Sequence, residues 1–379
     1  AALATTSALN PQARHAQDVL SRIQLASEPA GRALLHGALV DALHEMIGRL
    51  ADEAGASRRD VAEVVACGNT CMLHLLAGAD PTGLGRHPYT PALRGDQHVD
   101  AGALGGPGAR GLAIAAGARV WLPPIISSYV GADVTAGALA TELGRLPGVT
   151  LFVDIGTNGE MVLAAGGELH ATSTAAGPAF EGMNISRGMR AAPGAVERFA
   201  IEGGEIRVGT IGGRAPVGLC GSGLLDVVGE LAAHGVVDAG GRFARDARRL
   251  SPPIAARLVK LDGKPAFRVA GDVHLTQTDV RQVQLAKGAI RAGVELLLRA
   301  AGVPPAGVDR ALVAGSFGYH LRTRSLLDLG LIPAELGDRV SYVGNTSLTG
   351  ARALLLDQAA RAEARALAAR AGVVELARD

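Results

Sequence analysis

The stretch 151–160 holds the residues with the clearest chemical meaning in this chain of 379 residues. It reads Leu-Phe-Val-Asp-Ile-Gly-Thr-Asn-Gly-Glu, so an apolar run ends at Asp154 and small residues follow it. A carboxylate that closes a buried strand is costly unless a cation meets it. Small residues after it let a phosphate chain lie against backbone N–H groups, and Thr157 adds a hydroxyl. The pattern therefore suits a Mg²⁺-nucleotide, with Asp154 holding the metal directly or through water.

The same stretch is also typical of an ordinary tight hairpin. Asn158 and Gly159 stand between two apolar runs, and Asn-Gly is the strongest short hairpin signal because both residues tolerate positive φ. A hairpin by itself does not account for the carboxylate of Asp154. Both interpretations, a plain turn and a nucleotide site, therefore stay open on these residues alone.

Composition narrows the class of protein. The 37 basic residues nearly balance the 36 acidic ones, so no strong field favours nucleic acid or anionic lipid. Aromatic residues make up 3% of the chain, too few for a base-stacking platform. The 52 glycines and many alanines predict a globular α/β protein with tight turns. We find neither an apolar run of membrane-spanning length nor a signal-peptide pattern, so we expect a cytoplasmic location.

The three cysteines, Cys67, Cys71 and Cys220, are too few and wrongly spaced for a four-thiolate cluster or a zinc ribbon. Buried free cysteines are common in cytoplasmic cores. We therefore expect structural roles for all three, and no iron–sulfur cluster in the chain as given.

Strands and helices alternate along the chain, and the hairpin lies near its middle. Helix 30–55 carries a one-sided apolar stripe that predicts packing against a core. A proline-rich, glycine-rich insertion is expected over 78–117, and a variable stretch over 240–275. The other expected strands are 1–9, 61–66, 120–126, 150–164 as a hairpin, 168–173, 310–314 and 340–343, and the other helices are 11–26, 71–77, 131 onward, 218–234, 277–301 and 346–371.

An internal repeat predicts a duplicated α/β unit. Tyr129-Val-Gly131 with Gly137 matches Tyr342-Val-Gly344 with Gly350, at a constant offset of 342 − 129 = 213 residues. If the halves are duplicates, the first should also begin with a hairpin like 150–164. The chain starts at the expected third strand instead and has no initiator methionine, so we expect further sequence upstream.

Several stretches together resemble one protein family. The hairpin at 154–160 and the late strand that ends at 314–318 look like the superfamily of acetate and sugar kinases, heat-shock chaperones and actin. Within it, the chain is most similar to the ATP-dependent reductive activators of corrinoid proteins. The resemblance covers nearly the whole chain and rests on 7–12, 18–22, 68–70, 131–133, 154–160, 176–182, 218–224 and 314–318.

This resemblance implies an α/β fold of two duplicated ribonuclease-H-like, or actin-like, subdomains around a nucleotide cleft. The first subdomain would occupy 1–145, be truncated at its N-terminus and include the insertion 78–117. The second would occupy 146–379 and end in a long helix. Such activators also carry a ferredoxin-like domain with a [2Fe–2S] cluster, and we expect that cluster only in the absent N-terminal domain.

The resemblance also assigns site residues. It makes Asp154, Gly156, Thr157, Asn158 and Gly159 a phosphate-binding element, with ATP and Mg²⁺ as cofactors and Asp154 on the metal. Glu160 and Glu181 become catalytic candidates that order water or metal, or else ordinary structural carboxylates. The adenosine-side element consists of Gly315, Ser316 and Gly318.

Four further segments have two possible roles each. Gly68, Asn69 and Thr70 could present a helix N-terminus to phosphate or merely cap a helix. For 344–346 capping is the favoured role. Gly221, Ser222 and Gly223 could contact nucleotide or allow close packing. Asp133 could be an active-site carboxylate or a first-turn charge that answers the helix dipole.

The implied activity is ATP-gated electron transfer, with ATP hydrolysis in the intact protein coupled to reduction of Co(II) to Co(I). The implied partner is a corrinoid protein of methyl transfer, and a homodimer is left open. One alternative is a small-molecule kinase of the same superfamily. Another is a non-catalytic nucleotide-sensing module, which would bind ATP without turnover stimulated by a partner.

Overall fold

The computed structural model describes residues 2–105, 111–315 and 321–375, and these form two compact units. The first unit contains Ala1–Gly144 and Thr346–Val373, and the second contains Arg145–Asn345 and Val374–Asp379. The last helices therefore pack with the first unit although the chain reaches them from the second. No helix in the described ranges is long and apolar enough to cross a membrane.

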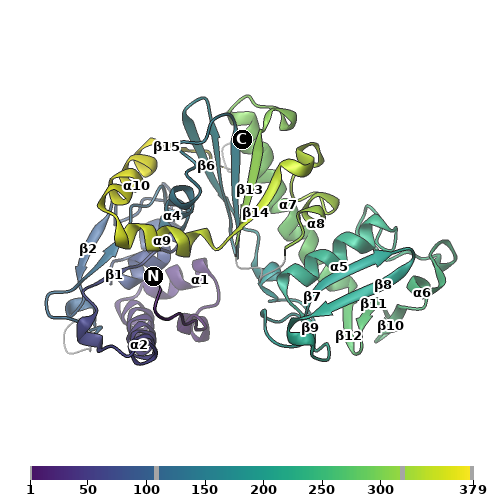
Figure 1. The fold of residues 1–379 in the computed structure, drawn as a ribbon, viewed down its shortest axis with the longest axis horizontal. Helices are drawn as coiled ribbons and strands as arrows, with labels where there is room; N and C mark the ends of the chain where they lie inside the picture. The colour runs from purple at the N-terminus through teal and green to yellow at the C-terminus, as the bar shows by residue number, and fades with distance from the viewer. Residues whose placement is uncertain (1, 106–110, 316–320, 376–379) are drawn as a thin grey trace. The chain divides into compact units, whose positions relative to one another are not determined.

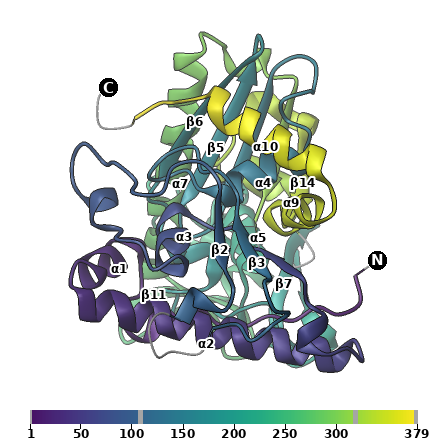
Figure 2. The ribbon, with the colours of Figure 1, turned by 90° about the vertical axis from the view of Figure 1, so that its left-hand side faces the viewer.

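Helices α1 (Val19–Ala26), α2 (Pro29–Glu53) and α3 (Thr70–Leu76) pack together in the first unit. Figure 2 shows α2 as the longest of them. The predicted helix over 11–26 is wrong. Residues Pro11–Arg14 form a 3₁₀ turn, and α1 begins later because Asp18 forms a capping box with Ser21.

Three short strands form the sheet of the first unit. Strand β1 (Glu63–Val65) runs parallel to β3 (Arg119–Leu122), and β2 (Gln97–Asp100) pairs antiparallel on the other side of β3. The apolar side chains of this sheet pack with those of α2 and α3. The strand expected over 1–9 is not formed by the described residues 2–9, which lack a pairing partner in the described sheets.

The two copies of the internal repeat meet as packed helices. They are α4 (Ala132–Ala140) and α9 (Thr346–Leu356), which contact each other closely within the first unit. A Cβ on Gly350 would lie 2.1 Å from the carbonyl oxygen of Ala136, beside Gly137. The repeated glycine therefore allows the two helix backbones to touch.

The single long helix expected to about 371 is in fact two helices. Helix α10 (Gln358–Arg370) follows α9 after Asp357, and β15 (Ala371–Val373) comes next. Asp357 has extended backbone angles (φ −136°, ψ 120°), and its side chain accepts the N–H of Ala359. Helix α9 therefore ends before Asp357, and α10 begins after this N-cap residue, which hydrophobic periodicity alone does not reveal.

Arg361 fixes α10 to the sheet of the first unit. Its guanidinium donates to both oxygens of Glu63 at 3.0 and 2.7 Å and to the carbonyl of Leu354 at 2.7 Å. It also lies 4.7 Å from the ring centroid of Trp121. One turn on, Arg365 pairs with Asp96, which also accepts the indole N–H of Trp121 at 2.8 Å.

The second unit is built on strands side by side in the order β14-β13-β4-β5-β6 (Figure 1). These are β4 (Thr150–Ile155), β5 (Gly159–Ala165), β6 (Glu168–Thr174), β13 (Arg310–Ala314) and β14 (Val340–Gly344). The first three form an antiparallel meander, and β13 and β14 add in parallel. This is the third-second-first-fourth-fifth order of a ribonuclease-H-like subdomain, as predicted. Helix α7 (Gln277–Ala300) packs on β5 and β6.

An inserted lobe lies between β6 and α7 in the chain. It holds two three-stranded sheets, a pattern the sequence analysis did not predict. The missed signal is Gly203-Gly204, both at positive φ, which joins two strands as a hairpin turn. The elements are β7 (Ala195–Glu202), β8 (Glu205–Thr210), β9 (Gly218–Leu219), α5 (Gly221–Ala233), α6 (Pro252–Ala255), β10 (Leu258–Leu261), β11 (Lys264–Ala270) and β12 (Val273–Thr276). Helix α8 (Thr323–Asp328), which follows β13, packs on α5.

Replacing Arg361 with methionine should destabilise the first unit by about 3 kcal/mol, because the change leaves Glu63 without its partner. Trp121 is the single tryptophan of the chain, so its fluorescence reports unfolding of this unit in urea. The control is Arg365→Met, whose 48% exposed side chain should cost less than about 1 kcal/mol. Equal urea midpoints for the two variants would contradict the role given to Arg361.

Candidate functional site

Asp154 and Glu160 lie directly opposite each other on β4 and β5. Leu151, Val153 and Ile155 face the core that α7 covers, so Asp154 points to the other face of the sheet. Like charges directly opposite on neighbouring strands repel each other, and a cation close to them would relieve this.

Oxygen ligands of this kind suit Mg²⁺, which binds through one or two carboxylates and takes the rest of its shell from water and phosphate. Among the described residues, no group of three or more His, Cys, Asp or Glu side chains is placed to hold a metal by itself. A metal at Asp154 would therefore take most of its ligands from water and phosphate.

The connection between these strands differs from the expected Asn-Gly turn. Ile155 pairs with Gly159, so the turn consists of Gly156, Thr157 and Asn158, and Gly159 already belongs to β5. None of the residues 156–159 has positive φ. A Cβ on Gly159 would lie 2.8 Å from Thr174 Oγ1, so this glycine is required by packing against β6.

Glu181 contacts this turn from the loop that follows β6. The hydroxyl of Thr157 donates to Glu181 Oε1 at 2.5 Å. Glu181 ends a short 3₁₀ turn, Pro178–Glu181, between Gly177 and Gly182, both at positive φ. The Thr157 hydroxyl is thus already bound to a carboxylate, and a phosphate at this turn would compete with Glu181 for it.

The end of β13 lies beside Asp154. Ala314 on β13 pairs with Asp154 on β4. Because the two strands are parallel, both end at the same edge of the sheet. Gly315 follows, donating its N–H to the carbonyl of Gly344 at 3.2 Å and accepting the hydroxyl of Tyr342 at 2.6 Å. The fold therefore brings two predicted site residues, Asp154 and Gly315, to one edge, while Ser316 and Gly318 lie outside the described residues.

The glycines at the start of α5 have different surroundings. A Cβ on Gly223 would lie 2.0 Å from the carbonyl oxygen of Val196, so this residue allows α5 to pack on β7. Ser222 is fully buried, with its hydroxyl 3.4 Å from Cys220 Sγ. The helix has no side-chain cap, which leaves the N–H groups of its first turn suited to an anion.

The segment Gly68-Asn69-Thr70 belongs to the first unit, where its side chains make local bonds. Asn69 caps α3 by accepting the N–H of Met72 at 2.9 Å. Buried Thr70 donates its hydroxyl to the carbonyl of Ser127 at 2.7 Å. A Cβ on Gly131 would lie 2.6 Å from the carbonyl oxygen of Gly68, so the loops before α3 and α4 touch. Capping accounts for the types of residue found here.

Asp133 sits in the first turn of α4. Burial raises its pKa to about 6, although its carboxylate accepts the N–H of Val134. Burial also raises the pKa of Cys67 to about 12, and the nearby Asp133 charge adds to this. The acid is thus held in a surrounding that disfavours its charge, more than a solvated first-turn residue would be.

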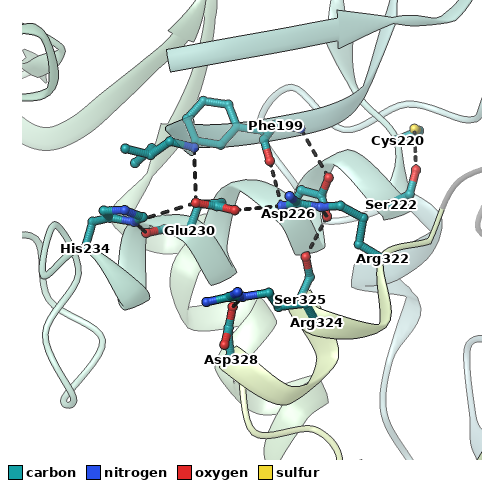
Figure 3. A network of polar contacts seen from close by, with 11 residues as sticks. Phe199, Cys220, Ser222, Asp226, Glu230, His234, Arg322, Arg324, Ser325 and Asp328 are labelled. Carbon is teal, nitrogen blue, oxygen red and sulfur yellow. Dashed lines mark hydrogen bonds and ion pairs between the residues drawn. The ribbon is translucent and has the colours of Figure 1, made fainter. Parts of the chain in front are cut away.

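Three polar residues of the second unit that no sequence motif singled out lie close together (Figure 3): Asp226, Glu230 and Arg322. Asp226 could have been noticed as a charge inside an apolar helical run, Leu-Leu-Asp-Val-Val at 224–228. Arg322 gives no such signal because its partners lie about a hundred residues away along the chain.

The strand order and the carboxylate at the end of β4 define the class of acetate and sugar kinases, heat-shock chaperones and actin. Residues 148–379 match the family model described as the C-terminal domain of RACo, the ASKHA domain, and residues 1–146 match the RACo middle region. The chain belongs to the RACo family of reductive activators. The family predicted from the motifs is confirmed, and the ASKHA assignment implies nucleotide binding.

Named relatives agree with this family. The chain is 34% identical over 362 residues to the corrinoid activation enzyme RamQ of Eubacterium limosum, covering 93% of this chain and 60% of RamQ. It is 32% identical over 246 residues to the [Co(II) methylated amine-specific corrinoid protein] reductase of Methanosarcina barkeri, covering 63% of this chain and 45% of the reductase.

A solved reductive activator for corrinoid, iron–sulfur protein superposes with a TM-score of 0.88 at 35% identity. The match covers 100% of this chain and 60% of that structure. The chain therefore spans at most about three fifths of the length of these proteins.

Asp133→Asn should stabilise the protein at pH 7 and remove the contribution of this residue to the pH dependence of the free energy of unfolding. The folded-state pKa of about 6 lies above the ordinary 3.8, so the folded form binds the proton more tightly. The contribution of Asp133 to stability is thus fully present below about pH 4 and is lost as pH rises through about 6. The variant should gain on the order of 2 kcal/mol at pH 7 and little at pH 4.

Urea denaturation at both pH values tests this, with the exposed Asp41→Asn on α2 as control. If Asp133→Asn loses stability at pH 7 while the control does not, the charged carboxylate is the favoured form and the interpretation is wrong.

Proposed function

We propose that this chain is the ATP-binding module of a reductive activator that drives reduction of Co(II) to Co(I) in a corrinoid protein of methyl transfer. The observation that carries the proposal is the shared edge of β4 and β13. There the carboxylate pair of Asp154 and Glu160 lies beside the turn at 156–158 and the end of β13. The names of the two relatives supply the corrinoid substrate.

In this proposal the phosphates lie against the backbone of the β4–β5 turn, and Asp154 holds the magnesium. Bound Mg²⁺ would neutralise phosphate charge during hydrolysis. Glu160 and Glu181 order water or metal, and Thr157 exchanges its hydrogen bond to Glu181 for one to phosphate. Gly315, Ser316 and Gly318 form the adenosine side. The electron enters from a [2Fe–2S] cluster outside these 379 residues.

ATP is needed because Co(I) is hard to reach from ordinary cellular donors. Each 100 mV of mismatch costs about 2.3 kcal/mol per electron. Closure on nucleotide can bias a complex by about 5 kcal/mol, which covers a mismatch on the order of 100–200 mV. The module contributes by binding the corrinoid protein, changing the ligation of its cobalt and closing around ATP.

Nucleotide can act on the partner only if the closed form holds it differently from the open form. Partner and nucleotide must then change each other's affinity by the same factor. A kinase of the same superfamily would not need this coupling, and a nucleotide sensor would bind ATP without turnover stimulated by the partner. The two alternatives are therefore separable by experiment.

Asp154→Asn in the full-length protein should weaken Mg-ATP binding at least about tenfold, because the change removes the negatively charged carboxylate that is proposed to hold the metal. Isothermal calorimetry measures this change. The matched control is Asp262→Asn, in the exposed turn between β10 and β11, which should bind as wild type does. Unchanged affinity and turnover in Asp154→Asn would rule out this site.

Mixing the full-length protein with a low-potential donor, ATP and a corrinoid protein under anaerobic conditions should produce the Co(I) spectrum. Partner in the Co(II) state should also stimulate ATP hydrolysis, because the proposal couples hydrolysis to reduction of that state. Equal Co(I) formation without ATP would favour the sensor, and phosphorylation of a small metabolite would favour the kinase.

A further inference from the structure

The carboxylate of Glu181 lies against the turn that connects β4 and β5. Its Oε1 accepts the hydroxyl of Thr157 at 2.5 Å. A Cβ on Gly156 would lie 3.8 Å from the same oxygen, so this carboxylate also lies beside the residue before Thr157. Glu181 is thus close to two of the three turn residues that the proposed function assigns to phosphate.

The hydrogen bond between Thr157 and Glu181 excludes a second bond of the same kind. A hydroxyl carries a single proton, so Thr157 can donate either to Glu181 or to a phosphate oxygen. Because the present acceptor is a carboxylate, the bond is charge-assisted and belongs to the stronger class. The carboxylate and a phosphate also carry charges of the same sign and repel each other. Glu181 therefore disfavours phosphate at this turn in two ways, by holding the donor and by its charge.

The segment that carries Glu181 is fixed on both sides. The preceding residue, Phe180, is 2% exposed and belongs to the core of the second unit. Farther along, Ser186 donates its N–H at 2.7 Å and its hydroxyl at 3.0 Å to the fully buried Asp279 at the start of α7. The carboxylate can therefore leave Thr157 by rotation of its own side chain, but its backbone keeps it near the turn.

Competition is supported more directly by this geometry than metal binding is. Among the residues that the structure describes, no three His, Cys, Asp or Glu side chains are placed to hold a metal together. Glu181 therefore does not combine with Asp154 and Glu160 into a ready cation site. A water ordered by Glu181, as in the proposed function, would follow only after Thr157 is released.

We infer that Glu181 limits nucleotide affinity, and so speeds nucleotide release, by competing with phosphate for the hydroxyl of Thr157. The inference rests on the proposed nucleotide site. A residue that weakens the binding of both ATP and ADP shortens the time that product stays bound, and product release limits turnover in many enzymes. The proposed activator must release ADP before each new cycle, which gives this competition a use.

The test measures the Kd of Mg-ADP and of Mg-ATP by calorimetry on the full-length protein. Glu181→Ala removes the acceptor and its charge and should lower each Kd about tenfold, as when a binding-competent fraction of about a tenth rises to nearly one. Glu181→Gln keeps a weaker, uncharged acceptor and should lower each Kd about threefold. Stopped-flow displacement of bound ADP should be slower in proportion. The glutamine variant carries the test if the alanine variant does not fold.

A double-mutant cycle tests whether Glu181 acts through Thr157. Thr157→Val removes the hydroxyl, and in that background Glu181→Ala should lower the Kd by no more than about threefold. The matched control is Glu168→Ala, which removes an exposed carboxylate at the start of β6 and should leave both Kd and Tm unchanged. Thermal unfolding without nucleotide shows which variants are folded.

The outcomes distinguish this inference from the proposed function. If wild type binds neither nucleotide, the proposed function fails and this inference fails with it. If wild type binds and a folded Glu181 variant binds equally well or more weakly, the inference alone is wrong. It is also wrong if Glu181→Ala tightens binding equally with and without the Thr157 hydroxyl.

Discussion

The parallel pairing of β4 with β13 is the constraint on which the second unit depends. Ala314 pairs with Asp154 although 160 residues separate them, and the inserted lobe and α7 lie between them in the chain. Apolar residues on both strands, such as Val153 and Val313, are fully buried in one core. Because this pairing sets where both strands end, it also decides which polar groups share the edge of the sheet.

At that edge the protein places negative charge where a nucleotide would add more. Asp154 faces Glu160 across the strand pair, and Thr157 already donates to Glu181. A phosphate bound at this turn, as proposed, would lie near these carboxylates and would compete with Glu181 for the Thr157 hydroxyl. In the proposed function, Mg²⁺ bound with the nucleotide would lessen the repulsion between these carboxylates and the phosphates.

Each unit also uses one arginine to join elements that are distant in sequence. Arg361 binds Glu63 in the first unit, and Arg322 binds Asp226 and Glu230 in the second. Arg361 makes a forked contact with both oxygens of Glu63 that lysine could not reproduce, whereas Nη2 of Arg322 donates to Glu230 and to the carbonyl of Phe199. The two side chains differ in exposure to solvent, since Arg361 is 5% exposed and Arg322 is 36% exposed.

Sequence alone determined the hairpin at 150–164, the strand 310–314, most of helix 277–301 and the family, because these depend on local periodicity and short motifs. It also identified Asp154 as the unusual carboxylate. Tertiary structure decided the rest. The role of Gly159 depends on Thr174, the break at Asp357 separates two packed helices, and the Arg322 network joins three separate segments. Contacts between distant segments leave no local pattern, so only the folded chain reveals them.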